Sequence, residues 1–554
     1  MTLAEQEDIR DLLIQGAERH RAGDILGAAE IYLQAQALDP RNGTVLGNLG
    51  VALRGLGHQE KALLVLEKAA TFAPGDPETQ YNFGNALRDA GRLEDAVTCF
   101  RRAIALRPTL PGPHVNLSLI LGHLGRHEAA AQAARLGLLH RPDNGSLWMN
   151  LGVALSNMKH HEAAVACFYR AVAHRPDDPA IHLNLASAHF TLSQIESSAA
   201  AARAALSLQP DRPAAHALLG QALTSQGRLD EALSALNQAL ALEPDNLTAQ
   251  LGRARALLLG GRWADGFPAY RARFRRVSFL TGPLSTPAWT GEEAPDQTLL
   301  LHAEQGLGDT LMGLRFVAAA RARVGRVVIQ VPPTLMGLAA RVEGVDDVVS
   351  LSDPVPAHDI QAPMLDLLRC LAIDPETVPA AMPYLSVPED LETPARPAGD
   401  ERLYVGLIWA GDPRHDNDVN RSCGLEPLMP LLALPGIRFL SLQVGEPRQQ
   451  LVEKGALGLV EDIAPALTDF SQTARFLMGL DLLISVDTGP VHLAGALNRP
   501  CWVLLPHAPD WRWMLDRTDS PWYPSLTLYR QPTVGDWQTV VERVKDDLRN
   551  QTGC

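Results

Sequence analysis

Three loops of this 554-residue chain combine glycine with side chains that bind charged groups, and the first covers residues 302–310 (HAEQGLGDT). The loop follows an apolar run and opens a stretch with helical spacing. Gly306 and Gly308 would let the backbone approach a ligand closely, with Gln305 beside them and Asp309 near the start of the helix. A plain strand-to-helix turn capped by Asp309 explains the same residues. The pattern matches neither a Walker A loop nor a full dinucleotide-binding motif, because the lysine and the third glycine of those motifs are missing.

The second loop covers residues 409–422 (WAGDPRHDNDVNRS) and also follows an apolar run. Such polar loops are usually solvated turns. Here Arg414, His415, Arg421 and Ser422 together have the chemistry to bind phosphate or hydroxyl groups, because arginine offers a planar fork of donors.

The third loop covers residues 485–492 (SVDTGPVH) and places Asp487, Thr488 and Gly489 between an apolar run and a helix. Proline after Gly489 suits the first turn of that helix, and the free amides there form a site for an anion. His492 lies on the same turn and would add a hydrogen-bond donor. The alternative for His492 is a buried structural histidine.

A short segment after the third loop, residues 507–513 (HAPDWRW), offers a carboxylate at Asp510, an aromatic surface at Trp511 and one cation. Tryptophan in this position fits a ligand-stacking surface. It fits the protein core equally well.

These loops require strands to hold them, and short apolar runs separated by helical or loop stretches predict an α/β region. Parallel sheets covered on both faces have such strands. A segment rich in proline and glutamate, residues 374–402, divides the region, so we expect two Rossmann-like lobes. The predicted strands are residues 299–302, 327–331, 348–351, 405–409, 439–443, 482–486 and 501–505.

The first half of the chain has a fixed period, because prolines recur at one constant interval. A small residue also recurs in one register, which lets two helices approach closely, while each proline ends the second helix of a pair. The pattern resembles tetratricopeptide (TPR) repeats, with seven full repeats over residues 9–246 and a divergent eighth around Trp263. This predicts an α-solenoid, a TPR superhelix. The prolines are Pro40, Pro74, Pro108, Pro142, Pro176, Pro210 and Pro244.

Five asparagines repeat in the same period, on the first helix of the middle repeats. Their amides are expected to project along the concave groove as a ladder, which resembles the asparagine ladder of O-linked N-acetylglucosamine transferase, where amides hold an extended polypeptide. The alternative is that each amide bonds a neighbouring backbone group. The five are Asn48, Asn82, Asn116, Asn150 and Asn184.

Composition limits the classes of function. A net charge of −14 and a pI near 5.6 disfavour nucleic acid as a partner. The six cysteines are widely spaced, the first residues lack the pattern of a secretory signal, and no run of 18 apolar residues occurs, so we expect a cytoplasmic protein without a membrane span.

Taken together, the three loops resemble the lipopolysaccharide heptosyltransferase family over residues 298–535, and the third loop carries most of the resemblance. The resemblance implies two lobes of the glycosyltransferase-B (GT-B) type. It implies that Asp487, Thr488, Gly489 and His492 bind the donor diphosphate and that Asp309 is the catalytic base. Arg421 and Ser422 join the donor site. Contacts with the sugar or the acceptor are expected from Gln305, Gly306, Gly308, Arg414, His415, Asp510 and Trp511.

Fusion to a TPR array is also similar to bacterial transferases that glycosylate flagellin, and it favours a protein acceptor, with flagellin as one possibility, over lipopolysaccharide. The expected enzyme is a glycosyltransferase that uses a nucleotide-sugar as co-substrate, without cofactor or metal. Two alternatives stay open: a TPR scaffold with a degenerate transferase fold, and a nucleotide-sugar epimerase.

The predicted domains are a TPR array at residues 1–276, a junction at 277–297, an acceptor-side lobe at 298–390 and a donor-side lobe at 391–554. Because repeat stacks and α/β lobes usually bury separate cores, we expect a fragment that starts near Thr281 to bind nucleotide without the repeats.

Overall fold

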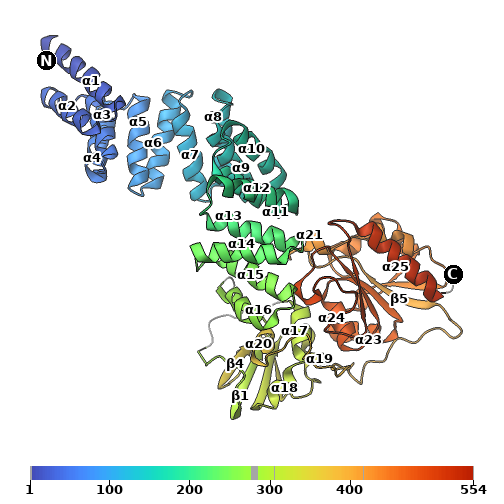
Figure 1. The fold of residues 1–554 in the computed structure, drawn as a ribbon. Coiled ribbons are helices and arrows are strands. Elements are labelled where there is room, and N and C mark those ends of the chain that lie inside the picture. The colour runs from blue at the N-terminus through green and yellow to red at the C-terminus, as the bar shows by residue number, and fades with distance from the viewer. Residues whose placement is uncertain (1–2, 276–284, 305, 416, 553–554) are drawn as a thin grey trace. The chain divides into compact units, whose positions relative to one another are not determined.

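The computed structural model describes residues 3–275, 285–304, 306–415 and 417–552 (Figure 1). Part of the predicted junction, including Thr281, and the predicted contact Gln305 therefore lie outside the described residues. The chain divides into two compact units, Met1–Pro210 and Asp211–Cys554.

The first unit is a stack of antiparallel helix pairs, as the repeat predicts. The recurring small residues, such as Ala28, Ala62 and Ala96, are completely buried between the paired helices. The helices end shortly before the recurring prolines, at Leu38 and Phe72 for example. The helices are α1 (Leu3–Arg21), α2 (Ile25–Leu38), α3 (Gly43–Gly55), α4 (Gln59–Phe72), α5 (Pro77–Asp89), α6 (Leu93–Leu106), α7 (Pro111–His123), α8 (His127–His140), α9 (Gly145–Asn157), α10 (His161–His174), α11 (Pro179–Thr191) and α12 (Ile195–Leu208).

The second unit begins with further helix pairs and continues into the α/β region. The predicted domain boundary at residue 276 follows the repeat pattern, whereas the last helix pairs form one compact unit with the sheets. These helices are α13 (Pro213–Ser225), α14 (Leu229–Leu242), α15 (Leu247–Leu259) and α16 (Trp263–Tyr270), followed by the 3-10 helix η1 (Arg271–Arg275).

The α/β region holds two parallel sheets. Within the described residues, the first sheet has the strand order β3-β2-β1-β4 and the second has β10-β9-β8-β5-β6-β7. The strands are β1 (Ala294–His302), β2 (Val324–Val331), β3 (Asp347–Ser350), β4 (Ile360–Pro363), β5 (Leu403–Ile408), β6 (Ile437–Ser441), β7 (Val460–Asp462), β8 (Leu482–Val486), β9 (Cys501–Leu505) and β10 (Leu526–Arg530). Every predicted strand is confirmed, whereas β4, β7 and β10 are additional.

Helices follow most of these strands, and three of them lie at the predicted loops: α17 after β1, α21 after β5 and α24 after β8. The helices are α17 (Leu307–Leu314), α18 (Val317–Arg321), α19 (Met336–Ala339), α20 (Leu367–Cys370), α21 (Asp418–Arg421), α22 (Gln450–Glu453), α23 (Phe470–Gly479), α24 (Gly489–Ala496) and α25 (Trp537–Thr552). No helix in these described ranges is both long enough and apolar enough to span a membrane.

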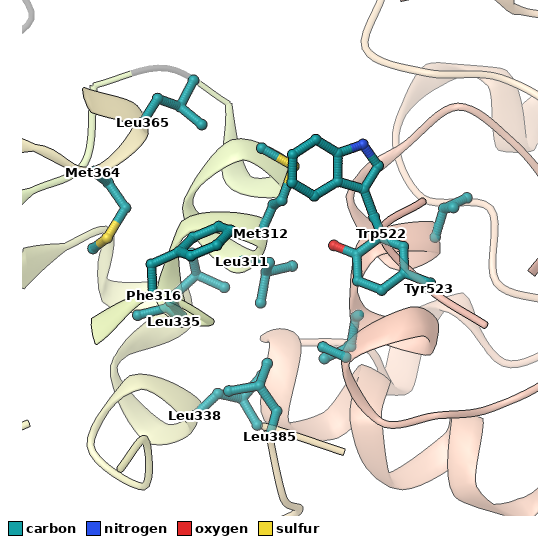
Figure 2. Packing of buried hydrophobic residues seen from close by; sticks show 14 of the residues in the cluster. Leu311, Met312, Phe316, Leu335, Leu338, Met364, Leu365, Leu385, Trp522 and Tyr523 are labelled. Carbon is teal, nitrogen blue, oxygen red and sulfur yellow. The ribbon is translucent and has the colours of Figure 1, made fainter. Parts of the chain in front are cut away.

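One hydrophobic core runs through the last repeat helices and both sheets. Leu311 and Met312 of α17 face Trp522 and Tyr523, which precede β10 (Figure 2). Trp263 of α16 stacks on Trp522 with ring centroids 4.7 Å apart. The expectation of separate cores is therefore wrong, because α16 and the sheets bury the same apolar surface.

The shared core predicts how fragments behave. A fragment of residues 211–554 should unfold cooperatively, whereas one of residues 285–554 should be partly folded or aggregated, because it lacks the aromatic residues of α16 that cover Trp511 and Trp522. Size-exclusion chromatography and near-UV circular dichroism of the two fragments check this. A monodisperse shorter fragment with the same unfolding midpoint as the longer one would contradict the prediction.

Candidate functional site

The first predicted loop places Asp309 in the first turn of α17. Asp309 Oδ2 accepts a hydrogen bond from the Gly306 amide at 3.0 Å, so the carboxylate helps to cap the helix, as the alternative explanation requires. Its other oxygen pairs with Arg512, from the segment after β9. Asp309 therefore has a structural role and also faces a charged group of the second sheet's region.

The third predicted loop meets the first one. A Cβ atom on Gly308 would lie 2.6 Å from His492 Cδ2, so only glycine allows this approach of α17 to α24. A Cβ atom on Gly489 would lie 3.8 Å from the Gly308 backbone nitrogen. In the same loop the Thr488 and Ser485 hydroxyls are 3.0 Å apart. The N-terminal ends of two helices thus lie together, which favours an anion near both.

His492 is buried and uncharged. Its Nδ1 lies 3.1 Å from the Tyr523 hydroxyl, and its ring stacks on Trp513 with centroids 5.4 Å apart. Burial, together with the charge on Arg512, lowers the pKa of His492 to about 3. The histidine can therefore act as a neutral hydrogen-bonding group at pH 7, and its contacts with Tyr523 and Trp513 agree with a structural role as well.

Arg512 is the cation at the centre of the site. Its side chain is 7% exposed and pairs with both Asp510 and Asp309. Burial alone would lower the pKa of Arg512, but the two carboxylates raise it, so the guanidinium stays charged. Burial raises the pKa of Asp309, and the charge on Arg512 offsets only part of this effect.

Asp487 completes a group of carboxylates. Burial raises the pKa of Asp487 to about 6, and the negative charge on Asp510 contributes to this rise. The Trp513 indole N–H faces the carboxylate and lowers the pKa, although no hydrogen bond of ordinary geometry joins the two groups. Arg512 and Arg421 also lower it. Asp487 thus titrates closer to neutral pH than an exposed aspartate.

The second predicted loop reaches the site through Arg421. The guanidinium bonds Asp418 at 3.1 Å, and its charge acts on Asp487. Ser422 Oγ accepts from the Gly411 amide and donates to Asp418, each at 2.9 Å, so this hydroxyl shapes the loop.

The remaining residues predicted in the second loop lie farther out. The Arg414 side chain is 88% exposed and pairs with Asp412. His415 is exposed, although its charge acts on Asp309. The structure thus brings Arg421 to the site and leaves Arg414 in solvent.

Trp511 belongs to the core. It is 2% exposed and packs edge-on against Trp263, Phe267 and Trp522. This agrees with the core alternative for the aromatic residues of this segment. Its neighbour Asp510 does lie in the site, where it pairs with Arg512.

The predicted asparagine ladder divides into two groups. Asn116 donates to Asn85 Oδ1 at 2.6 Å, and the buried Asn150 donates to Val115 O at 3.1 Å and to Ser118 Oγ at 2.9 Å. Both amides bond neighbouring helices, but only Asn150 bonds a backbone group, as the alternative explanation requires. By contrast, Asn48, Asn82 and Asn184 are half-buried and make no side-chain hydrogen bond within the described residues.

Residues beyond the candidate site residues predicted from the sequence contribute to the site. Arg512, Trp513 and Tyr523 touch the predicted residues directly. The charge of Arg255 on α15 acts on Asp510, and α15 packs against the 3-10 helix η8 (Trp511–Trp513). Arg512 is the one cation noted from the sequence in residues 507–513, whereas no local signal points to Arg255.

Comparison with known proteins agrees with both halves of the chain. Residues 448–511 match the family described as glycosyltransferase family 9 (heptosyltransferase). Tetratricopeptide repeat families match residues 18–77, 84–125, 149–213, 183–245 and 218–275. These matches support a TPR-fused glycosyltransferase.

Among curated proteins, the chain is 26% identical over 320 residues to protein FlbA of Caulobacter vibrioides, covering 52% of this chain and 53% of FlbA. The match thus spans about half the length of that relative. Among solved structures, PilF of Pseudomonas aeruginosa is 19% identical and covers 38% of this chain and 96% of its own, with a TM-score of 0.35. The Cut9–Hcn1 hetero-tetramer is 19% identical over 44% of this chain and 48% of the other, with a TM-score of 0.38.

The raised pKa of Asp487 predicts a pH-dependent stability. Folded Asp487 binds its proton more tightly than the unfolded chain does, so the folded state loses stability as the pH rises from about 4 to about 6 and does not regain it above. Asp487→Asn should therefore raise the thermal midpoint by a few degrees at pH 7.5, since about 1 kcal/mol corresponds to roughly 2–4 °C, and change it little at pH 4. Asp265→Asn, on an exposed pair, is the control. An equal effect of Asp487→Asn at both pH values would refute the assignment.

Proposed function

We propose that this protein transfers a sugar from a nucleotide-sugar donor to a protein acceptor recruited by the TPR repeats, with its two sheets acting as the lobes of a GT-B enzyme. The observation that carries the proposal is the meeting of α17 and α24 at Gly308 and His492, with Arg512 between carboxylates from both sheets' regions. An anion site beside a carboxylate base would serve glycosyl transfer, and this arrangement supports the proposal of both.

The donor diphosphate is proposed to lie at the N-terminal end of α24, near Thr488 and Gly489. The helix amides there favour an anion, and Arg512 and Arg421 are the nearby cations. In the reaction the bond from the anomeric carbon to the diphosphate oxygen breaks, and negative charge collects on the leaving group. Amides and guanidinium groups stabilise that charge, so we propose a reaction without metal or other cofactor.

Asp309 is proposed to take the proton from the acceptor hydroxyl as its oxygen attacks the anomeric carbon. The raised pKa of Asp309 suits a base, because a very weak base would accept the proton poorly. A diphosphate would compete with Asp309 for Arg512. Donor binding would then free the Asp309 oxygen for the acceptor, which orders the two substrates.

The acceptor is proposed to be a polypeptide held by the first unit, with flagellin among the proteins to test first. The half-buried amides of Asn48, Asn82 and Asn184 leave donors and acceptors for peptide groups. A cytoplasmic location fits the described cysteines, which are all free thiols.

The proposal is tested first by thermal-shift screening of the whole chain against UDP, ADP, GDP, CMP and their sugars. A ligand at 100 times its Kd adds about 2.7 kcal/mol to stability. Transfer to protein is then measured with the donor found, with and without a chelator. A scaffold would bind no donor, and an epimerase would convert the donor without any acceptor. Loss of all activity with the chelator would contradict the metal-independent reaction.

Replacing Asp309 separates its two roles. Asp309→Asn keeps an oxygen for the Gly306 amide but cannot take a proton, so turnover should fall by about 10² to 10⁴ while the donor still binds. Loss of the ion pair with Arg512 should also lower the thermal midpoint, so turnover is measured at a temperature at which the variant is folded. Turnover and isothermal titration with the donor nucleotide give the two quantities. Near-normal turnover in the folded variant would leave Asp309 with a capping role alone.

The ladder is tested by the triple variant Asn82→Ala, Asn116→Ala, Asn150→Ala. If the amides bind peptide groups, each lost bond costs about 0.5 to 1.5 kcal/mol, so acceptor KM should rise while donor affinity stays unchanged. Because Asn116 and Asn150 also bond neighbouring helices, a second variant, Asn48→Ala with Asn82→Ala and Asn184→Ala, avoids those contacts. Unchanged acceptor KM in both variants would leave the asparagines with structural roles alone.

A further inference from the structure

A buried ion pair joins the end of the repeat helices to the first predicted loop. Arg273 of η1 donates from Nε and Nη2 to the two oxygens of Glu304, each at 2.8 Å. The side chains of Arg273 and Glu304 are 6% and 1% exposed. Two parallel hydrogen bonds between charged planar groups fix distance and orientation at once, which a single contact does not.

The remaining groups of the pair are also held. Arg273 Nη1 donates to Tyr270 O at 3.1 Å, and the guanidinium lies 4.6 Å from the Tyr270 ring centre and 4.1 Å from that of Phe274. Glu304 Oε1 accepts from the Leu365 amide at 3.1 Å, and Asp366 lies 3.8 Å from Arg273. Arg273 thus ties η1 to two connections of the first sheet, one after β1 and one after β4.

Glu304 stands close to the residues of the proposed base. It follows β1 almost directly and lies just before Gly306, whose amide donates to Asp309. Glu304 also accepts from the Leu365 amide in the 3-10 helix η3 (Met364–Asp366), and η3 packs against α17, the helix that carries Asp309. Burial raises the pKa of Glu304, the charge on Arg273 lowers it, and the charge on Asp309 raises it. Arg273 thus offsets the repulsion that the Asp309 charge exerts on Glu304.

We infer that Arg273, a residue of the repeat-derived part of the chain, is a positioning residue for catalysis, which holds Asp309 in place through Glu304. The inference rests on the proposed function of Asp309. Stability alone does not account for the pair, because well-packed apolar side chains replace buried ion pairs at little or no cost in stability. A pair with a fixed orientation beside a base holds that base in position. This matters because a displacement of about 1 Å at a reacting group can reduce the rate by about 10²-fold.

The test compares a variant that keeps the volume of the pair with a variant that keeps the shape of Glu304. In the whole chain, Arg273→Met with Glu304→Met replaces the ion pair by apolar side chains, and Glu304→Gln keeps the oxygen that accepts from Leu365. Both should keep the wild-type Kd for the donor nucleotide and lose about 10- to 100-fold in kcat. Arg273→Lys keeps the charge without the fork and should recover part of that loss.

Arg262→Met, on an exposed pair with Asp265, is the matched control and should keep full activity. Circular dichroism and the thermal midpoint establish folding, and Glu304→Gln decides the matter if the double variant does not fold. A wild-type kcat in the folded Glu304→Gln variant, or in the folded double variant, overturns the role of Arg273 and leaves the proposed function standing. A wild-type chain that transfers no sugar overturns the proposed function, and this inference with it.

Discussion

The arrangement of the candidate site depends on the free energy that it costs to bury the charged side chain of Arg512. An isolated charge in a protein interior is very unfavourable, and partners must lie within contact distance. Asp510 comes from the same segment, but the second partner, Asp309, belongs to the helix after β1 of the first sheet. Pairing therefore requires α17 to lie near the segment after β9, and the absence of a side chain at Gly308 permits the close approach of α17 to α24 that accompanies it. Charge and packing select the same arrangement.

The last helix pair also helps to hold Arg512 in place. Trp263 and Phe267 of α16 cover Trp511, which adjoins both Asp510 and Arg512. The segment that carries the central cation is thus held from one side by apolar packing and from the other by charge. Because α16 supplies this packing and η1 supplies Arg273, the last repeat belongs to the architecture of the site.

Much of the fold could be predicted, because helix pairs and buried strands leave a pattern in neighbouring residues of the sequence. The site could be predicted only for residues that stand in a recognisable short motif. The constant interval between prolines identifies the helix pairs. The strands β8 and β9 are buried along their whole length, so the apolar run in the sequence gives the bounds of each strand. The additional strand β4 is short, alternates in burial and ends in Pro363, so it lacks the continuous apolar run of a central strand.

Within the site, Asp309, Asp487 and His492 stand in glycine-containing loops after strands, and the structure brings them together. Arg273 and Glu304, in contrast, are 31 residues apart and lie in segments of different kinds, so only the folded chain relates them. The position of Trp511 in the core also depends on Trp263, a partner from the repeat half of the chain that is distant in the sequence.

The division of the repeats between two units also bears on how such a chain can evolve. Tandem repeats gain and lose copies by unequal recombination, in steps of one whole repeat, and each repeat contacts only its neighbours. A change of copy number within Met1–Pro210 leaves untouched the core that α16 shares with the sheets, whereas loss of the segment from α15 to η1 would remove Trp263 and Arg273 together. The first unit can therefore change in length without disturbing the shared core, while the last repeat must be inherited with the sheets as one piece.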